Sequence, residues 1–347
     1  MKEKKKNTII GFSIGDVNGI GIEVILKALS DNRILDIMTP VIYGSEKALT
    51  FYKNLITPTN IHLHKIKSIN QVSSKKVNFI SVCNENITIN PGENSTAAGK
   101  YAFESLEAVT NDLAAAKIDV IVTGPINKKN IQSDQFNFPG HTEYLTSLSN
   151  ADDSLMLMVH ENLKVGVVTN HLPLSSVSEV LDKELIFKKL VLLNNSLKLD
   201  FGIASPKIAV LGLNPHAGEN GMLGDEEEKL ISPAVQMGKS NNIFAFGPFP
   251  ADGFFGAGSF QEFDGVLAMY HDQGLVPFKT IAGGRGVNFT AGLPIVRTSP
   301  DHGTGFDIAG KNIANETSLR NAIYLGVDIH KNRLFNKSIN SDPLHKN

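Results

Sequence analysis

Three apolar segments of the sequence end in a histidine. They are VGVVTNH, IAVLGLNPH and GVLAMYH, which end at His171, His216 and His271. Each segment has the composition of a buried strand, and ligand sites of parallel sheets form at the carboxyl ends of the strands. Three imidazoles converging there would bind a divalent cation and let it act as a Lewis acid. The alternative is that each histidine is a hydrogen-bonded loop residue, since the separations along the chain are long.

Two aspartates are candidate acid or base groups. Asp272 directly follows the last of the three histidines. It either orients an imidazole through a hydrogen bond or caps the helix that follows. Asp252 lies in the expected loop PFPADGFFG and is a further candidate for proton transfer.

Residues 138–145, FPGHTEYL, place His141 and Thr142 after a Pro-Gly turn, where a helical pattern begins. Backbone N–H groups at such a helix N-terminus, with an imidazole and a hydroxyl beside them, can hold a phosphate group. An ordinary turn and helix cap is the alternative.

Residues 279–310 form the stretch richest in groups that recognise anions. Arginine and lysine suit phosphate or carboxylate groups, and the glycines of the stretch let the backbone approach a ligand closely. For any single residue, solvation at the surface is the alternative. The polar candidates are Lys279, Arg285, Asn288, Arg297, Asp301 and His302.

Several common catalytic motifs are absent. No G-x-G-x-x-G follows the first strand, and PGENSTAAGKY is not a P-loop, because its glycine spacing is wrong and Tyr101 replaces the Ser or Thr. There is no H-E-x-x-H pair. Cys83 is interpreted as an inert strand residue. The run DEEE, residues 225–228, is interpreted as the acidic first turn of a helix, which Pro233 kinks or begins.

The composition excludes several classes of protein. The chain has 347 residues, a net charge of −2 and 41% hydrophobic residues, which suffices for a large core and suggests two domains. The near-neutral net charge does not indicate binding to nucleic acid, which a strongly basic chain would. Residues 2–6 are interpreted as a solvated basic tail and residues 336–347 as a frayed one.

Membrane and disulfide signals are also missing. No apolar run approaches the roughly 18 residues of a membrane span, and the N-terminal apolar segment is too short for a signal peptide. The single cysteine excludes an intramolecular disulfide and a cysteine-based zinc cluster. We therefore expect a cytoplasmic protein whose metal ligands, if it binds metal, are His, Asp or Glu.

Short β-branched runs alternate with longer helical patterns along the chain. This alternation predicts βαβ units and an α/β fold with a largely parallel, helix-covered sheet. The predicted strands are residues 7–15, 40–44, 76–82, 118–127, 163–171, 207–216 and 263–271. The predicted helices are residues 19–29, 45–55, 97–117, 182–199 and 224–240.

These residues together resemble the 4-hydroxythreonine-4-phosphate dehydrogenase family of pyridoxine biosynthesis. The resemblance spans nearly the whole chain. Its motifs, in order, are GDVNGIGIEV, VTGPINK, FPGHTEYL, VTNHLPL, LNPHAGENGMLGDEE, YHDQGLVPFK and GVNFTAGLPIVRTSPDHGTGFDIAG. The first motif departs from the family, because Val17, Asn18 and Ile22 stand where Pro, Ala and Pro are usual, which leaves the local turn geometry open.

The resemblance implies a fold like that of the isocitrate and isopropylmalate dehydrogenases, with two α/β/α domains around a central active-site cleft. The first domain would comprise residues 1–128 and 285–347, and the second residues 129–284. The active site would be shared between the subunits of a homodimer, without nucleic acid or membrane as a partner.

The resemblance also implies roles for particular residues. The metal ligands would be His171, His216 and His271. The substrate would contact His141, Thr142, Lys279, Asn288 and Arg297. The cofactor would contact Asp301, His302, Gly303, Gly310 and Asn312. Lys279, Asp252 and Asp272 are the candidates for acid–base catalysis.

The implied reaction is the NAD- or NADP-dependent oxidation of 4-phosphooxy-L-threonine to 2-amino-3-oxo-4-phosphooxybutanoate, which decarboxylates to 3-amino-2-oxopropyl phosphate. Histidine ligands favour zinc, with cobalt or magnesium as alternatives. Two other functions stay open: oxidation of a sugar-acid phosphate such as D-erythronate or D-threonate 4-phosphate, and metal-dependent hydrolysis without a nicotinamide.

Overall fold

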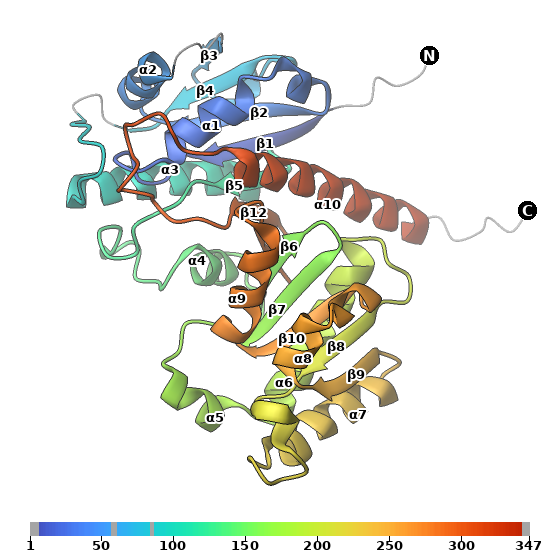
Figure 1. Cartoon of the computed structure of the whole chain (residues 1–347). Coiled ribbons are helices and arrows are strands. Elements are labelled where there is room, and N and C mark those ends of the chain that lie inside the picture. Colours follow the sequence, from blue (N-terminus) through green and yellow to red (C-terminus); the bar gives the residue numbers. More distant parts are fainter. Residues whose placement is uncertain (1–6, 57–60, 84–86, 342–347) are drawn as a thin grey trace, which may run out of the picture. The chain divides into compact units, whose positions relative to one another are not determined.

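The computed structural model describes residues 7–56, 61–83 and 87–341 (Figure 1). The expected basic tail at residues 2–6 lies outside this part of the chain, as do residues 342–347 of the expected C-terminal tail. The chain divides into two compact units. Unit 1 comprises residues 1–149 and 295–330, and unit 2 comprises residues 150–294 and 331–347.

Unit 1 contains a parallel sheet whose strand order is β3-β4-β2-β1-β5-β12. Its strands are β1 (Thr8–Ser13), β2 (Met38–Gly44), β3 (Leu63–Ile66), β4 (Val77–Ser81), β5 (Val120–Thr123) and β12 (Val296–Pro300). Its helices are α1 (Gly21–Leu29), α2 (Glu46–Leu55), α3 (Thr96–Ala114), α4 (His141–Leu148) and the first part of α10 (Thr317–Ser341). Ser45 caps α2, since its side chain accepts a hydrogen bond from the Ala48 N–H.

Helices cover both faces of this sheet. A Cβ on Gly11 of β1 would lie 2.4 Å from Val109 of α3, so glycine lets the helix approach the strand closely. A Cβ on Gly326 of α10 would lie 2.8 Å from Val120 of β5. Val120 pairs with Ile10, the neighbour of Gly11, and adjacent strand residues point to opposite faces. Helices α3 and α10 therefore cover opposite faces.

Unit 2 contains a mixed sheet whose strand order is β11-β6-β7-β10-β8-β9. Strands β7, β10, β8 and β9 are parallel, whereas β6 is antiparallel to both β11 and β7. The strands are β6 (Leu155–His160), β7 (Leu163–Thr169), β8 (Lys207–Leu211), β9 (Phe244–Phe249), β10 (Gly265–Tyr270) and β11 (Val287–Ala291). The helices are α5 (Val177–Val180), α6 (Lys183–Leu199), α7 (Ser232–Ser240), α8 (Ala251–Gly256) and α9 (His271–Ala282).

This sheet also lies between helices. A Cβ on Gly265 of β10 would lie 2.9 Å from Leu197 of α6, whereas Ala268 of the same strand faces Gly274 of α9. The two strand residues are an odd number of positions apart, so α6 and α9 cover opposite faces. The α9 side is filled by a buried core that includes Met156, Val165, Val167, Ala209, Leu211, Phe254, Val266, Ala268 and Phe278.

The predicted alternation of strands and helices is confirmed, with two local corrections. The segment with Asp252 is helix α8 rather than a loop. Residues 336–341 continue α10 instead of fraying.

The chain passes from one compact unit to the other at residues that differ from the expected domain boundaries. Residues 129–149 belong to unit 1, since Tyr144 of α4 packs against the rings of Phe103 and Phe136. Residues 285–294 belong to unit 2, since β11 pairs along its length with β6. Both sets of contacts join residues that are distant in the sequence, and the sequence pattern does not predict such contacts.

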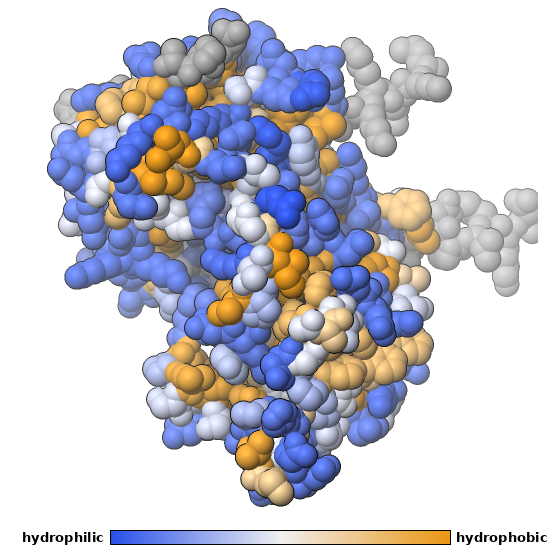
Figure 2. All heavy atoms as spheres, viewed as in Figure 1, coloured by the Kyte–Doolittle hydropathy of each residue, from blue (hydrophilic) through white to orange (hydrophobic). Residues whose placement is uncertain are grey.

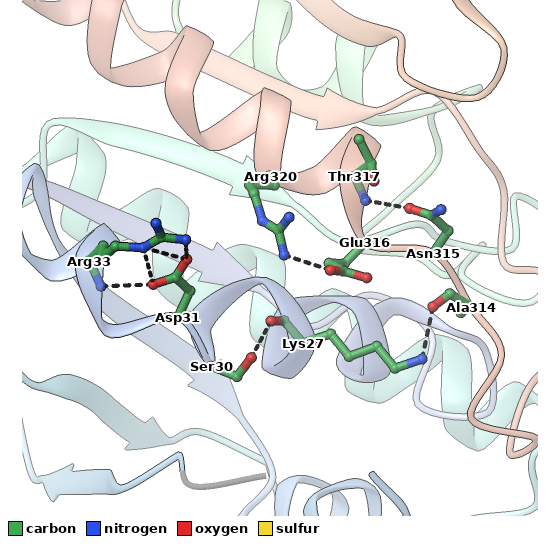
Figure 3. A network of polar contacts seen from close by, with 9 residues as sticks. All are labelled: Lys27, Ser30, Asp31, Arg33, Ala314, Asn315, Glu316, Thr317 and Arg320. Carbon is green, nitrogen blue, oxygen red and sulfur yellow. Dashed lines mark hydrogen bonds and ion pairs between the residues drawn. The ribbon is translucent and has the colours of Figure 1, made fainter. Parts of the chain in front are cut away.

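The ion pair of Lys27 with the buried Glu23 fixes the loop before α10 to α1 in unit 1, and Figure 3 shows the bond of Lys27 to Ala314 in that loop. The ammonium of Lys27 contacts the carboxylate of Glu23 at 2.7 Å and donates to the carbonyls of Asn312 and Ala314 at 3.1 and 2.8 Å. Glu23 is fully buried and also accepts from the Ala314 N–H at 2.9 Å. Figure 3 also shows the pair of Arg33 with Asp31, whose side chains are 89% and 35% exposed.

We expect Lys27→Met to lower the free energy of unfolding by about 3–5 kcal/mol, because it leaves the Glu23 carboxylate buried without its cation. Arg33→Met is the control, since an exposed ion pair contributes little. Urea unfolding of the three proteins measures the difference. Equal midpoints for Lys27→Met and Arg33→Met would contradict a structural role for the buried pair.

Candidate functional site

Two of the three strand-end histidines lie together in unit 2. Strands β7 and β10 pair in parallel with Thr169 opposite Tyr270, and the Thr169 hydroxyl donates to the Met269 carbonyl at 2.9 Å. His171 follows β7 by two residues, and His271 is the first residue of α9, directly after β10. Their ring centroids are 5.6 Å apart with the planes inclined by 41°. Strand pairing thus places two imidazoles at one edge of the sheet.

Asp272 contacts the imidazole of its neighbour. Its Oδ1 lies 2.7 Å from Nδ1 of His271, whose side chain is 34% exposed. The residue that caps α9 is Tyr270, without a side-chain hydrogen bond, so Asp272 is not the cap. Donation from Nδ1–H to the carboxylate selects the tautomer in which Nε2 carries the free lone pair.

His216 lies on a turn beyond the end of β8. The predicted strand to residue 216 is too long: β8 ends at Leu211, and His216 belongs to the turn Pro215–Gly218, with a left-handed backbone at φ 53°. The exposed His216 lines a cavity of about 700 Å³ in unit 2. The cavity is also lined by Leu213, Asn214, Asp252, Phe255, Tyr270, Asp272, Gln273 and Val276.

The three histidines do not form a closed ligand set within one chain. Among residues 7–56, 61–83 and 87–341, no group of three or more His, Cys, Asp or Glu side chains is placed to hold a metal ion. The pair His171 and His271 has suitable donors, and His216 lies on a separate turn. Asp252 shares the cavity with His216 but is exposed on α8.

One glutamine ties the ends of β8 and β10 together. The side chain of Gln273 accepts from the Met269 N–H at 2.7 Å and donates to the Gly212 carbonyl at 2.5 Å. It therefore fixes the segment before His216 to the start of the helix that bears His271. Gln273 was not among the residues selected from the sequence, although it stands two residues after the candidate ligand His271.

A second group of polar side chains, in unit 1, surrounds Arg297. Arg297 lies on β12, is 3% exposed and donates to the Thr123 hydroxyl from Nε and Nη2 at 3.1 and 2.8 Å. Burial lowers the pKa of Arg297 to about 10, an effect that nearby Glu143 opposes, so the guanidinium stays charged at neutral pH. A buried cation of this kind is suited to an anionic ligand.

His141 is the first residue of α4. Burial, then the positive charges of Arg297 and Lys128, lower its pKa well below the usual value, so the imidazole is neutral at pH 7. Its Nε2 is buried and has no hydrogen-bond partner among the described residues. Lys128 is a cation of this group that the sequence analysis did not select, although it ends the quoted motif VTGPINK.

The other two expected substrate residues belong to unit 2. Asn288 pairs with Met158 in the sheet, and its Oδ1 is buried without a partner in the part of the chain that the structure describes. Lys279 is exposed in the last turn of α9. The expected substrate residues therefore come from both units, with His141, Thr142 and Arg297 in unit 1.

The expected cofactor residues lie in the loop between β12 and α10. Its backbone packs against two other loops of unit 1: Ile20 N–H donates to the Thr304 carbonyl at 2.9 Å, and a Cβ on Gly310 would lie 2.7 Å from Pro91. In the described structure, Nε2 of His302 and Oδ1 of Asn312 are buried without partners. These are the orphaned polar atoms that a bound ligand would satisfy. The expected residues are Asp301, His302, Gly303, Gly310 and Asn312.

Asn18, one of the departures from the family motif, has a defined role in this region. Its side chain accepts from the Asn90 N–H at 2.8 Å and donates to the Glu93 carbonyl at 2.9 Å. Its own N–H donates to Asp16 at 2.9 Å. Burial raises the pKa of Asp16, against hydrogen bonds from Asn130 and Asn18 that lower it. The replacement therefore joins the first turn to the loop at residues 90–93.

Known proteins match the chain over nearly its whole length. The family model for the pyridoxal phosphate biosynthetic protein PdxA matches residues 36–326. The chain is 44% identical to the 4-hydroxythreonine-4-phosphate dehydrogenase of Bacteroides thetaiotaomicron, over 97% of this chain and 93% of that protein. It is 37% identical to the D-threonate 4-phosphate dehydrogenase of Cupriavidus necator, over 94% of this chain and 98% of that protein.

Solved structures agree with these matches. The crystal structure of 4-hydroxythreonine-4-phosphate dehydrogenase from Klebsiella pneumoniae superposes with a TM-score of 0.81 at 33% identity, over 95% of this chain and 99% of that chain. An isocitrate dehydrogenase from Methylococcus capsulatus shares the fold, with a TM-score of 0.51 at 13% identity, over 96% of this chain and 89% of that chain. The expected fold class is confirmed. By its sequence and fold, the chain belongs to the family of the pyridoxal phosphate biosynthetic protein PdxA.

Proposed function

We propose that the chain is an NAD(P)-dependent dehydrogenase that oxidises 4-phosphooxy-L-threonine. The observation that carries the proposal is the buried Arg297 beside the unpartnered His141 and the cation Lys128. This group offers positive charge and a free imidazole nitrogen to an anionic substrate. The activity is that of the relative from Bacteroides thetaiotaomicron, which is 44% identical.

The proposed substrate contacts are His141, Thr142 and Arg297 of unit 1, with Lys279 and Asn288 of unit 2. Arg297 would bind a phosphate or carboxylate group. Neutral His141 can accept a hydrogen bond from a hydroxyl or ammonium group of the substrate, or donate one to an oxygen, depending on its tautomer. The buried Oδ1 of Asn288 would accept a hydrogen bond. Lys279, Asp252 and Asp272 are the groups proposed to take up or release protons.

The proposed metal ligands are His171, His216 and His271. Their neutral nitrogens are donors that zinc favours, and cobalt is an alternative. A bound cation would polarise the substrate alcohol and stabilise negative charge on its oxygen. Since the described part of one chain brings only His171 and His271 of this set together, we propose that the set is completed in a homodimer.

Exposed apolar side chains next to the histidines support a second subunit there. Leu172 and Leu174 follow His171 and are 43% and 71% exposed, and Met222, on the loop after His216, is 80% exposed. Figure 2 shows hydrophobic residues at the surface around α5. Exposed apolar surface of this kind is typical of subunit interfaces.

The proposed cofactor site is the loop that contains Asp301, His302, Gly303, Gly310 and Asn312. Its buried unpartnered atoms could bind the polar groups of a dinucleotide. No helix in the described part of the chain is long and apolar enough to span a membrane. The cytoplasmic location expected from the sequence remains part of the proposal.

D-threonate 4-phosphate is the second candidate substrate. It is favoured by the 37% identity to the Cupriavidus necator enzyme of that name. Both candidates carry a phosphate and a secondary alcohol, so the group around Arg297 suits either.

The two substrates can be distinguished by steady-state kinetics with NAD⁺ and with NADP⁺. We expect reduced nicotinamide to form with 4-phosphooxy-L-threonine at the higher kcat/KM. Removal of metal by a chelator should abolish turnover, and added Zn²⁺ or Co²⁺ should restore it. A higher kcat/KM with D-threonate 4-phosphate would replace the proposed substrate, and phosphate release without nicotinamide reduction would overturn the dehydrogenase assignment.

Arg297→Met should lower kcat/KM about 10- to 150-fold, since a charge-assisted hydrogen bond contributes about 1.5–3 kcal/mol and 1.4 kcal/mol is a tenfold change. Arg33→Met, which removes an exposed arginine of the same unit, should keep the wild-type value. Circular dichroism and the unfolding midpoint report whether each variant is folded. An unchanged kcat/KM in folded Arg297→Met excludes the arginine from substrate binding.

His216→Ala should lose bound metal and turnover together, because it removes one of three proposed ligands. Metal content after gel filtration and the rate of nicotinamide reduction are the two measurements. His160→Gln is the control, since His160 pairs with Leu163 at the start of β7, the opposite end of that strand from His171. Wild-type metal content and turnover in His216→Ala would exclude the proposed ligand set.

A further inference from the structure

We propose that Glu227 is a positioning residue, which holds the turn that bears His216 in its left-handed conformation. The inference rests on the proposed function only in taking His216 as a metal ligand. The geometry of the turn is independent of that assignment. Glu227 and Glu228 lie in the acidic first turn of a helix, as expected for residues 225–228. Glu227 has contacts in addition, with the backbone before the His216 turn.

Glu227 is buried, whereas its neighbours Asp225 and Glu228 are exposed. It is the first residue of a π-helical turn, Glu227–Ile231, that leads into α7, and such turns are often found at functional sites. Pro233 lies in the first turn of α7, as the sequence suggested. The π-turn directs the Glu227 side chain toward the segment between β8 and His216 instead of toward solvent.

The carboxylate of Glu227 binds two successive backbone N–H groups. Its Oε1 accepts from the N–H of Leu213 and of Asn214, both at 2.7 Å. Its Oε2 accepts from the side-chain amide of Asn214 at 3.0 Å. Successive N–H groups directed at one oxygen form an anion-binding concavity. Here the anion is a side chain of the protein itself.

Glycines allow this close approach. A Cβ on Gly218 would lie 2.7 Å from Oε2 of Glu227, and one on Gly212 would lie 3.0 Å from Oε1. Among the described residues, no Lys or Arg lies within ion-pair distance of Glu227, so N–H groups compensate its charge. A buried carboxylate is tolerated only when it is hydrogen-bonded in this way.

The turn that bears His216 has an unfavourable backbone conformation, which contacts with its surroundings must stabilise. His216 and Ala217 have φ of 53° and 51°, and Glu219 has φ of 44°. Non-glycine side chains disfavour this region, so the conformation persists only where surrounding contacts determine it. The N–H of Ala217 donates to the carbonyl of Asn214 at 3.1 Å. Glu227 therefore holds Asn214, the residue whose carbonyl accepts the hydrogen bond of the turn.

The test compares Glu227→Ala with Glu228→Ala, a matched control that removes an exposed carboxylate one position away. In metal-free protein, we expect Glu227→Ala to shift the NMR signal of the His216 ring and to speed amide exchange at Leu213 and Asn214 at least tenfold. Glu228→Ala should change neither. Glu227→Gln keeps a carbonyl acceptor and should restore much of the wild-type behaviour.

Binding of Co²⁺ to each protein gives a second measurement. We expect its affinity to fall about 10- to 100-fold in Glu227→Ala, the size of effect found for groups that orient metal ligands. If wild-type protein binds no Co²⁺, the metal assignment fails, while the ring and amide signals still decide the role of Glu227.

An unmoved His216 ring signal with wild-type amide exchange in folded Glu227→Ala overturns the proposal. If that variant does not fold, Glu227→Asp takes its place, because it keeps the charge but withdraws the oxygens from the turn. The same two signals should then change, and unchanged signals in folded Glu227→Asp overturn the proposal as well.

Discussion

The pairing of β7 with β10 is the interaction on which the candidate metal site depends. Parallel strands with both faces buried satisfy their N–H and C=O groups in a shared ladder, and the pattern of buried side chains specifies its register. The register places Thr169 opposite Tyr270, so the chain leaves both strands at the same edge. His171 and His271 lie together for that reason and not because of any contact between their rings.

The turn after β8 follows a different principle. It is not part of a ladder, and its left-handed residues are intrinsically disfavoured. Hydrogen bonds from distant side chains compensate: Gln273 binds the Gly212 carbonyl, and Glu227 binds the next two N–H groups. Of the three proposed ligands, the sheet therefore positions His171 and His271, whereas buried polar contacts position His216. The position of His216 depends more strongly on single side chains.

Much of the fold could be predicted from the sequence, because strands such as β1, β7 and β10 are buried apolar runs and helices such as α2 carry ordinary caps. Strands β3, β6, β9, β11 and β12 were not predicted. The domain boundaries differ because β11 joins the sheet through β6, a partner far away in sequence. The candidate residues could be selected by type and motif. Lys128, Gln273 and Glu227 also stand in the quoted motifs, but their residue types are common at protein surfaces, and only their neighbours in the fold indicate their roles.

The family, the α/β class and the set of histidines follow from residue types and their order along the chain. The contacts and the burial of those residues follow only from the folded chain. The tertiary structure shows that Asp272 contacts an imidazole and does not cap a helix, that burial keeps His141 neutral, and that the carboxylate of Glu227 faces inward. The physical reason is that hydrogen-bond partners and desolvation depend on neighbours brought together by folding, and local sequence does not specify them.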